Sequence, residues 1–484
     1  MLQGKKTEFS QKSWRRINMR SVSHLLGVEF MHNLYNRHLP RINSTRFRNT
    51  NISWKGGLVN SYAPQEEWDA LACWFGRKFL KLDKRLLEQM DGLLTFDRNF
   101  YNSFINSLER LNLKKLSGVN LGLTLIDLQD YTLGELYQVN LVQIEHALTY
   151  AIGTLLERHE KNEAKRNQLF ASLIVAKTLT ESQKEDLEFE KIVKFGLAKK
   201  IDNPKKNKAI ALKIKNHWEK YAFTNCAYGE LPRGIIFYLN RYKNFYRRQT
   251  LTGNKLTELI NERYKVSANL LNSLQDKKLK ILVPLMVAVG VFRDFNKAQL
   301  GKTIKYKLDI LDEIARRKLE NRDALNYYLL FEILNLLEKG QKVSKKEIHA
   351  RKIFGVRLVR REYLEVDKLV SEKNMKSRGN FLKGVCASGG VVIGKATIVL
   401  NKNDATKVKK GNIMVAVGTD FDLMEAIQIS SAVITEEGGL LSHAAVVCRE
   451  MIKPCCIGVA HATEILNDGM KIKVDANNGI ITII

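Results

Sequence analysis

The stretch TEEGGLLSHAAVVCREMIKPCCIG, residues 435–458, decides the fold of the C-terminal part of this chain. It continues a strand-like run, SAVIT, after which Gly438 and Gly439 permit a tight turn. Ser442 stands where a helix N-cap is expected, so His443 falls in the first turn of a helix. Free backbone N–H groups and the helix dipole favour an anion there. A histidine at such a position can take and hold a phosphoryl group. By spacing alone, however, a lone histidine near a Gly-Gly turn is more often a capping or hydrogen-bonded residue than a nucleophile, so the pattern leaves both interpretations open.

The residues on both sides of this stretch alternate between short strands and short helices. The expected strands are rich in β-branched residues and are bounded by Gly, Asn or Asp. They are 391–400, 413–417, 432–435, 470–474 and 480–483, and the expected helices are 422–429, 442–450 and 462–466. Residues 381–484 therefore predict a compact α/β domain.

The chain before residue 365 has a different pattern. Apolar residues recur there at helical spacing, and the whole chain has only six prolines. The segment 366–380 is charged and weakly apolar, which is typical of a linker. We therefore expect a multidomain protein: a large, basic all-α domain over 1–365, a linker over 366–380 and a small α/β domain over 381–484.

Three runs of the last domain resemble a known family. GVCASGGVVIGKATIV (384–399), GGLLSHAAVVCREMIKPCCIG (438–458) and ILNDGMKIKVDANNGIITI (465–483) are similar to the phosphohistidine, or mobile swivelling, domain of phosphoenolpyruvate-utilising enzymes. That family includes phosphoenolpyruvate synthase, pyruvate phosphate dikinase and rifampin phosphotransferase. The resemblance covers essentially all of 381–484 and implies a β/β/α swivelling fold.

The resemblance also implies roles for single residues. His443 corresponds to the phosphorylated histidine, and the residues that present it or bind its phosphate are Gly438, Gly439, Ser442, Arg449 and Glu450. Two positions depart from the family pattern. Leu441 replaces a threonine that is a regulatory site in some dikinases, which argues against such control here. Thr419-Asp420-Phe421 replaces a Thr-x-Pro motif and leaves the packing of that loop open.

The helical region resembles, more loosely, the part that precedes the mobile domain in rifampin phosphotransferase and phosphoenolpyruvate synthase-like proteins. The segments 214–223, 291–317 and 324–340 carry this likeness, which implies an acceptor-binding region. Candidate acceptor-site residues are Arg293, Asp294, Lys297 and Lys302; the alternative is that they form the solvated face of a helix. His217 and Tyr221 stand four residues apart on one helix face, and we expect them to serve packing rather than catalysis.

No Gly-rich phosphate loop and no room for an ATP-grasp domain are evident in the sequence. The leading hypothesis is therefore the acceptor-plus-carrier subunit of a split phosphotransferase. The resemblance implies that an ATP-grasp partner, with ATP and Mg²⁺ in its own site, places the β-phosphate of ATP on His443 and yields AMP and phosphate. The acceptor would be a hydroxyl-bearing small molecule or a pyruvate enolate. We expect no permanently bound cofactor and no metal site in this chain.

Charge divides the chain in the same place. The formal net charge is +28, yet residues 381–484 hold ten basic and ten acidic residues, so the excess lies before residue 381. A second hypothesis is therefore a non-catalytic phosphocarrier or regulatory module whose basic helical domain binds a protein or a nucleic acid. A spread of lysines over solvated helices is favoured over nucleic-acid binding. A truncated relic is a third possibility, against which the intact run 438–450 argues.

The sequence also predicts a compartment. The basic N-terminus has no apolar run of the secretory kind, and the six cysteines form no CxxC pair. The apolar run 281–292 is too short to span a bilayer and contains Pro284, so we expect a buried core helix there. These features favour a cytoplasmic protein without a membrane segment.

Overall fold

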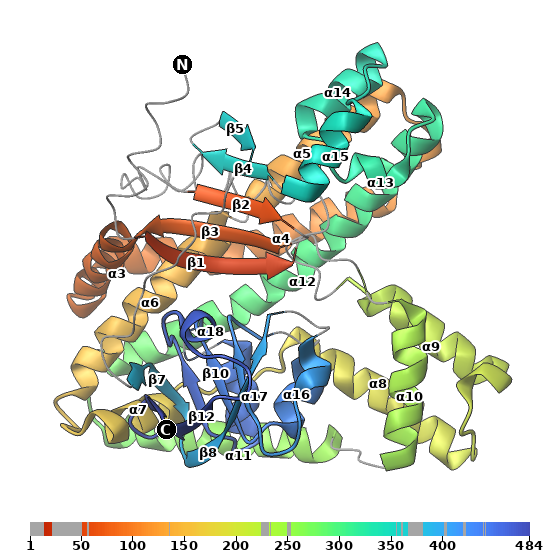
Figure 1. Ribbon diagram of the computed structural model, residues 1–484. Helices are drawn as coiled ribbons and strands as arrows, with labels where there is room; N and C mark the ends of the chain where they lie inside the picture. The colour runs from red at the N-terminus through yellow and green to blue at the C-terminus, as the bar shows by residue number, and fades with distance from the viewer. Residues whose placement is uncertain are drawn as a thin grey trace.

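The computed structural model describes residues 14–21, 51–55, 58–134, 136–223, 232, 234–248, 253–354, 356–359, 362–365, 381–400, 404–419, 423–438, 440 and 442–484. The predicted linker 366–380, Gly439 and Leu441 lie outside these residues. Figure 1 shows a large helical body with the C-terminal domain, residues 381–484, seated against its lower half.

The helical body is built around α12 (Leu279–Lys318), a helix of 40 residues that includes the predicted core run and keeps Pro284 inside it. Apolar residues at helical spacing form buried faces in this region, for example Ile144, Leu148, Ile152 and Leu155. The other helices are α3 (Gln65–Leu80), α4 (Lys84–Glu109), α5 (Gly118–Gly134), α6 (Leu136–Leu156), α7 (Glu163–Leu173), α8 (Glu181–Ala198), α9 (Lys208–Tyr221), α10 (Ile235–Arg248), α11 (Gly253–Ser273), α13 (Arg322–Leu325), α14 (Leu330–Lys339) and α15 (Lys345–Phe354). The 3₁₀ turns are η2 (Leu113–Lys115) and η3 (Pro204–Lys206).

The all-α prediction for residues 1–365 is wrong at both ends of that region. Five strands form one antiparallel sheet in the order β1-β3-β2-β4-β5. They are β1 (Trp14–Ser21), β2 (Asn51–Lys55), β3 (Leu58–Pro64), β4 (Val356–Val359) and β5 (Glu362–Glu365). The central pair, β2 with β4, aligns Asn51 with Val359. Local periodicity cannot reveal such a pairing, because its partners lie about 300 residues apart.

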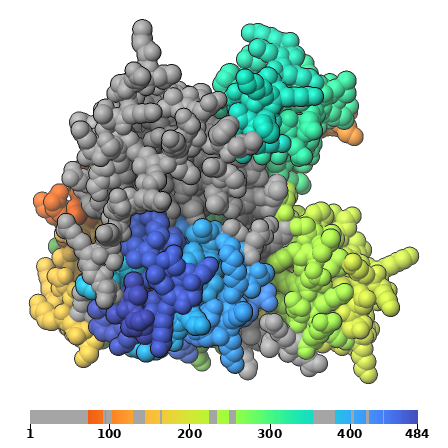
Figure 2. Space-filling view, viewed as in Figure 1, coloured from red at the N-terminus to blue at the C-terminus, as the bar shows by residue number. Residues whose placement is uncertain are grey.

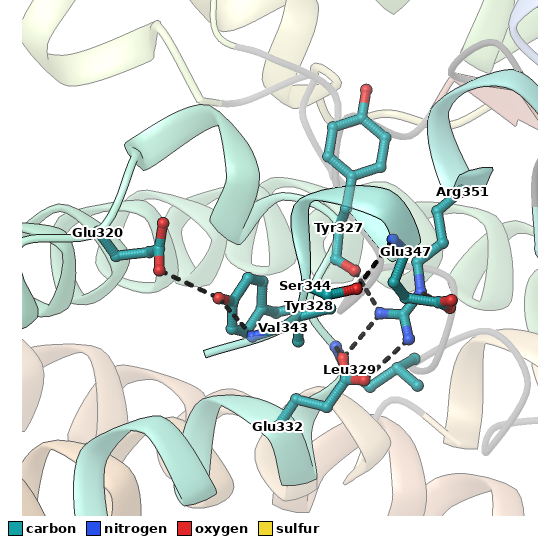
Figure 3. Close-up of polar contacts among 9 residues, drawn as sticks. All are labelled: Glu320, Tyr327, Tyr328, Leu329, Glu332, Val343, Ser344, Glu347 and Arg351. Carbon is teal, nitrogen blue, oxygen red and sulfur yellow. Dashed lines mark hydrogen bonds and ion pairs between the residues drawn. The ribbon is translucent and has the colours of Figure 1, made fainter. Parts of the chain in front are cut away.

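Helices α13 to α15 form a small lobe that Arg351 ties together (Figure 3). The Arg351 guanidinium donates to both carboxylate oxygens of Glu332, at 2.7 and 2.8 Å, and to the carbonyl oxygen of Tyr327 at 2.6 Å. Tyr328 joins the segment before α14 to the segment before α15, because its hydroxyl accepts from the Val343 amide at 2.9 Å. A bidentate arginine–carboxylate pair fixes orientation as well as distance.

The C-terminal domain has an eight-stranded sheet in the order β6-β13-β12-β8-β9-β10-β11-β7. Strands β8 to β11 are parallel neighbours, and the remaining pairs are antiparallel. The strands are β6 (Phe381–Lys383), β7 (Val385–Ser388), β8 (Val391–Val399), β9 (Ile413–Ala416), β10 (Ala432–Thr435), β11 (Cys455–Ile457), β12 (Lys471–Asp475) and β13 (Ile480–Ile483), and a 3₁₀ turn η4 (Asp404–Lys407) follows β8. The helices are α16 (Met424–Ile429), α17 (His443–Glu450) and α18 (Ala462–Ile465). All five predicted strands and all three predicted helices are confirmed within two residues; β6, β7 and β11 were not among the predicted strands.

The C-terminal domain and the body share one apolar core. Phe170 and Leu173 of α7 belong to the same buried cluster as Ala387 of β7 and Cys448 of α17. In Figure 2 the domain (blue) lies between the yellow region of α6 and α7 and the green helices α9 and α10. The structure therefore describes a docked arrangement of the two parts.

Candidate phosphohistidine site

The predicted phosphohistidine lies where two parallel strands end. β9 and β10 run side by side, with Ala416 aligned to Thr435, so the loops that follow them emerge at one edge of the sheet. Backbone pairing continues past both strands, because the Glu437 amide donates to the carbonyl oxygen of Val417 at 2.7 Å. The carboxyl ends of parallel strands are common places for ligand sites. This edge brings the loop after β9 to the first turn of α17, which begins at His443.

The turn before α17 depends on Gly438 and Ser442. Gly438 has φ +119°, a conformation that side chains rarely adopt, and a Cβ there would lie 2.7 Å from Ser442 Oγ. Ser442 is the N-cap of α17, and its hydroxyl accepts from the Ala445 amide at 3.4 Å. A larger residue at Gly438 would therefore push out the cap that starts the helix at His443.

Thr419 holds the imidazole ring of His443. Its hydroxyl oxygen lies 2.9 Å from His443 Nδ1, in a partly buried contact. Thr419 comes three residues after β9 ends, so the parallel β9–β10 pairing is what places it beside the histidine. The sequence drew attention to Thr419 only as the start of a departure from a family motif. Its role as the partner of the ring was missed, and Asp420 and Phe421 lie outside the described residues.

Arg449 braces the loop instead of pointing along the helix towards His443. Its Nη2 donates to the carbonyl oxygen of Leu440 at 2.5 Å. Burial lowers the pKa of Arg449 to about 10, and its Nη1 is buried without a hydrogen-bond partner. The expectation that Arg449 binds phosphate directly stays a prediction, and the contact that the structure provides is with the loop that presents the histidine.

Glu450 connects the C-terminal domain to the body. Its Oε1 accepts from Gln183 Nε2 of α8 at 2.6 Å, and the guanidinium of Arg263 on α11 donates to the carbonyl oxygen of Arg449 at 3.5 Å. Burial raises the pKa of Glu450, and the charges of Arg263 and Arg449 offset part of that rise. The family's Arg-Glu pair thus has two separate tasks here: Arg449 holds the histidine loop and Glu450 the docking contact.

The four acceptor-site candidates do not converge on one point. Arg293 forms an ion pair with buried Glu145 of α6. Asp294 Oδ2 accepts from the Glu181 amide at 2.6 Å, and burial raises the pKa of Asp294. Lys297 is partly buried and Lys302 is exposed. Arg293 and Asp294 therefore bond to other helices of the body, and the role of all four residues towards an acceptor stays a prediction.

His217 and Tyr221 pack as expected, within a polar network that the sequence did not suggest. His217 Nε2 and Arg241 Nη1 both lie 2.6 Å from Glu185 Oε1, and all three residues are buried. The rings of His217 and Tyr221 are 4.7 Å apart. This network binds α8, α9 and α10 into one unit, which we call the three-helix unit.

The described residues hold neither a candidate metal site nor a candidate membrane-spanning helix. They contain no group of three or more histidine, cysteine, aspartate or glutamate side chains arranged for a metal ion. None of their helices is both long and apolar enough to cross a membrane.

Comparison with known proteins places the C-terminal domain. Residues 408–479 match the family model "PEP-utilising enzyme, mobile domain". A probable phosphoenolpyruvate synthase of Archaeoglobus fulgidus is 33% identical over 187 residues, which are 37% of this chain and 24% of that protein. The phosphoenolpyruvate synthase of Pyrococcus furiosus is 39% identical over 100 residues, which are 21% of this chain and 12% of that protein.

Some of the matches are longer than the C-terminal domain and so include part of the helical body. The rifampicin phosphotransferase of Bacillus cereus is 28% identical over 291 residues, which are 54% of this chain and 32% of that protein. The chain thus spans about a third or less of the length of these relatives. Taken with the geometry around His443, these matches mean that the chain carries a PEP-utilising enzyme mobile domain and resembles the phosphoenolpyruvate synthases and rifampicin phosphotransferases in its C-terminal region.

Proposed function

We propose that this chain is the carrier part of a phosphotransferase and that His443 holds the phosphoryl group in transit. The observation that carries the proposal is the Thr419 contact, 2.9 Å from His443 Nδ1, at the capped first turn of α17. A threonine hydroxyl that accepts from Nδ1–H places the lone pair of the imidazole on Nε2. Nε2 is then the nucleophile, and the helix N-terminus stabilises the charge of the bound phosphate.

An ATP-grasp unit outside the residues described here is the proposed phosphoryl donor, with ATP and Mg²⁺ bound in its own site. Nε2 attacks the β-phosphorus of ATP and AMP leaves; water then removes the γ-phosphate, so that one phosphoryl group stays on His443. This chain supplies the oriented ring, the capped turn and the brace from Arg449 to Leu440. The metal is assigned to the partner, where it would neutralise the charge of the phosphates.

Delivery would follow by movement of the C-terminal domain. The phosphorus–Nε2 bond breaks while a bond forms to the oxygen of a hydroxyl-bearing acceptor, whose proton passes to solvent or to a nearby base. The docked arrangement, held by Gln183 and Glu450, is the proposed station on the body that carries the acceptor site. The relatives' names suggest rifampicin and the enolate of pyruvate as acceptors to test.

The test is a phosphohistidine assay. Full-length protein is mixed with ATP labelled at the β-phosphate, Mg²⁺ and candidate ATP-grasp proteins, and acid-labile, base-stable phosphate on the chain is measured. We expect labelling of the wild type and none of His443→Ala. The matched control is His461→Ala, which removes an exposed histidine that bonds to Glu464 in the same domain. Equal labelling of His443→Ala and wild type would refute the proposal.

A further inference from the structure

Helix α12 changes character along its buried face. Towards its start this face is apolar up to Phe292, and near its end Ile310, Leu311 and Ile314 are buried in a second apolar cluster, beside the buried Glu313. Between these two apolar stretches, buried polar side chains recur at intervals of three or four residues, which places them on one side of the helix. They are Asn296 (0% exposed), Gln299 (6%), Thr303 (0%) and Lys307 (1%).

The hydrogen bonds of this polar stretch are incomplete. Neither amide atom of Asn296 has a hydrogen-bond partner, although the residue is fully buried. Glu145, which is 1% exposed, uses Oε2 for the ion pair with Arg293, while its Oε1 also lacks a partner. Thr303, by contrast, is satisfied, because its hydroxyl donates to the Leu300 carbonyl oxygen at 2.7 Å.

Buried polar atoms without a hydrogen bond destabilise the folded state. Nearly all buried polar atoms in folded proteins are hydrogen-bonded, and an unsatisfied one costs about 1–3 kcal/mol. Arg293 and Asn296 stand three residues apart on α12, so Asn296 lies one helical turn from the Glu145 pair. Three polar atoms without a hydrogen-bond partner, two on Asn296 and one on Glu145, thus lie about one helical turn of α12 apart.

From this shortfall we infer that Asn296 and Glu145 form a binding site for the hydroxyl groups of a small, neutral acceptor molecule. Asn296 offers one donor and one acceptor, and Glu145 Oε1 offers a second acceptor. Adjacent hydroxyl groups, which both donate and accept, complete this set. Arg293 already neutralises Glu145, so the site presents hydrogen bonds rather than a net charge to a ligand.

The position of the site fits an acceptor, a point that depends on the proposed function. Asp294, two residues before Asn296, bonds to the first turn of α8, and Gln183 in that same turn bonds to Glu450 of the carrier domain. Asn296 therefore lies two residues along α12 from Asp294, which bonds to the helix turn that also makes the docking contact. A buried acceptor would also be shielded from water, which competes for the phosphoryl group.

The test measures binding to unphosphorylated, full-length protein by calorimetry, with glycerol, D-ribose and rifampicin as separate probes. We expect at least one probe to bind the wild type and Asn296→Leu to weaken that binding at least tenfold. Lys305→Ala, an exposed change on the same helix, should leave the affinity unchanged. Asn296→Ala serves as a second variant, and circular dichroism verifies the fold of both.

The competing explanation is that ordered water alone fills the site. In that case no probe binds, or binding is equal in wild type and Asn296→Leu, while the leucine variant melts at a higher temperature; either outcome overturns the inference. The binding measurement needs no phosphohistidine, so its result is independent of the labelling of His443. Either proposal can therefore be refuted while the other holds.

Discussion

The site around His443 and the polar networks of the helical body are assembled in opposite ways. His443 and Thr419 are 24 residues apart in the chain, and one pair of parallel strands brings them together. In the body, the Glu145–Arg293 pair spans 148 residues and joins two helices. The His443 site depends on the geometry of one small domain. The polar networks of the body form only when helices that are distant in the sequence have packed together.

The comparison also concerns charge. The C-terminal domain is neutral, and Arg449 and Glu450 each have a definite contact within or beside it. The whole net charge of +28 lies in residues 1–380, and the body buries ionised groups in its interior. Because the C-terminal domain is neutral, it is not repelled electrostatically when it docks on the basic body. The buried charges of the body, in contrast, are stable only when they are paired.

The largest effect is expected in the three-helix unit. Arg241→Met removes a guanidinium that pairs with Glu185 and Asp186 and leaves the buried Glu185 carboxylate with His217 alone. Breaking a buried ion pair in this way costs about 3–5 kcal/mol. We expect that loss in the free energy of unfolding, measured by urea titration with circular dichroism.

The matched control is Lys220→Ala in the same unit. Lys220 pairs with Glu188 at 2.8 Å, but both side chains are largely exposed. Exposed pairs contribute about 0–1 kcal/mol. Equal losses in Arg241→Met and Lys220→Ala would contradict the view that buried, long-range networks hold the body together.

The same contrast explains what the sequence could predict. The turn, the cap and the position of His443 follow from consecutive residues, and the sequence indicated all of them. Thr419 as the ring's partner needed the strand order, and the Glu185 network needed the packing of three helices. The sheet of β1 to β5 needed a pairing of the first and last parts of the body. Local pattern therefore predicted the helical character of the body and most elements of the C-terminal domain. It did not reveal the sheet of β1 to β5 or the contacts made across the fold.

The next largest effect is expected at the boundary of the two regions. Gln183→Leu removes the donor to the half-buried Glu450 carboxylate. A hydrogen bond to a charged group contributes about 1.5–3 kcal/mol, so the docked state should weaken by about ten- to hundredfold. Hydrogen exchange should become faster in α17 and in the first turn of α8. Unchanged exchange in both helices would show that the other contacts, the apolar one with α7 and the bond from Arg263 to the Arg449 carbonyl, are enough to fix the docking.

A smaller effect is expected at the histidine. Thr419→Val keeps the shape of the side chain but removes the hydroxyl beside His443 Nδ1. The lost hydrogen bond contributes about 1 kcal/mol to the orientation of the ring, so labelling of His443 should slow by roughly five- to tenfold. The free energy of unfolding should change much less. Thr419→Ser restores the hydroxyl and should restore most of the rate. If the Thr419→Val and Thr419→Ser variants are labelled equally slowly, the slower labelling would result from lost packing and not from the lost hydrogen bond.

The smallest effect is an acid sensitivity confined to the three-helix unit. Burial raises the pKa of Glu185, but its hydrogen bond with His217 and the charge of Arg241 outweigh burial and hold the pKa below the ordinary value of 4.5. The unfolded chain therefore binds this proton first, and Glu185 contributes stability that is complete above about pH 4.5 and is lost as the pH falls through the lower, folded value. Asp186 and Glu190 also face this cluster, so Glu185→Gln is compared with wild type by hydrogen exchange of α9 between pH 3 and 6. We expect protection in the wild type to fall more steeply on acidification than in the variant, since the glutamine has no proton to bind. The C-terminal domain should show no difference between the two proteins, and parallel pH profiles in α9 would assign its acid sensitivity to other carboxylates.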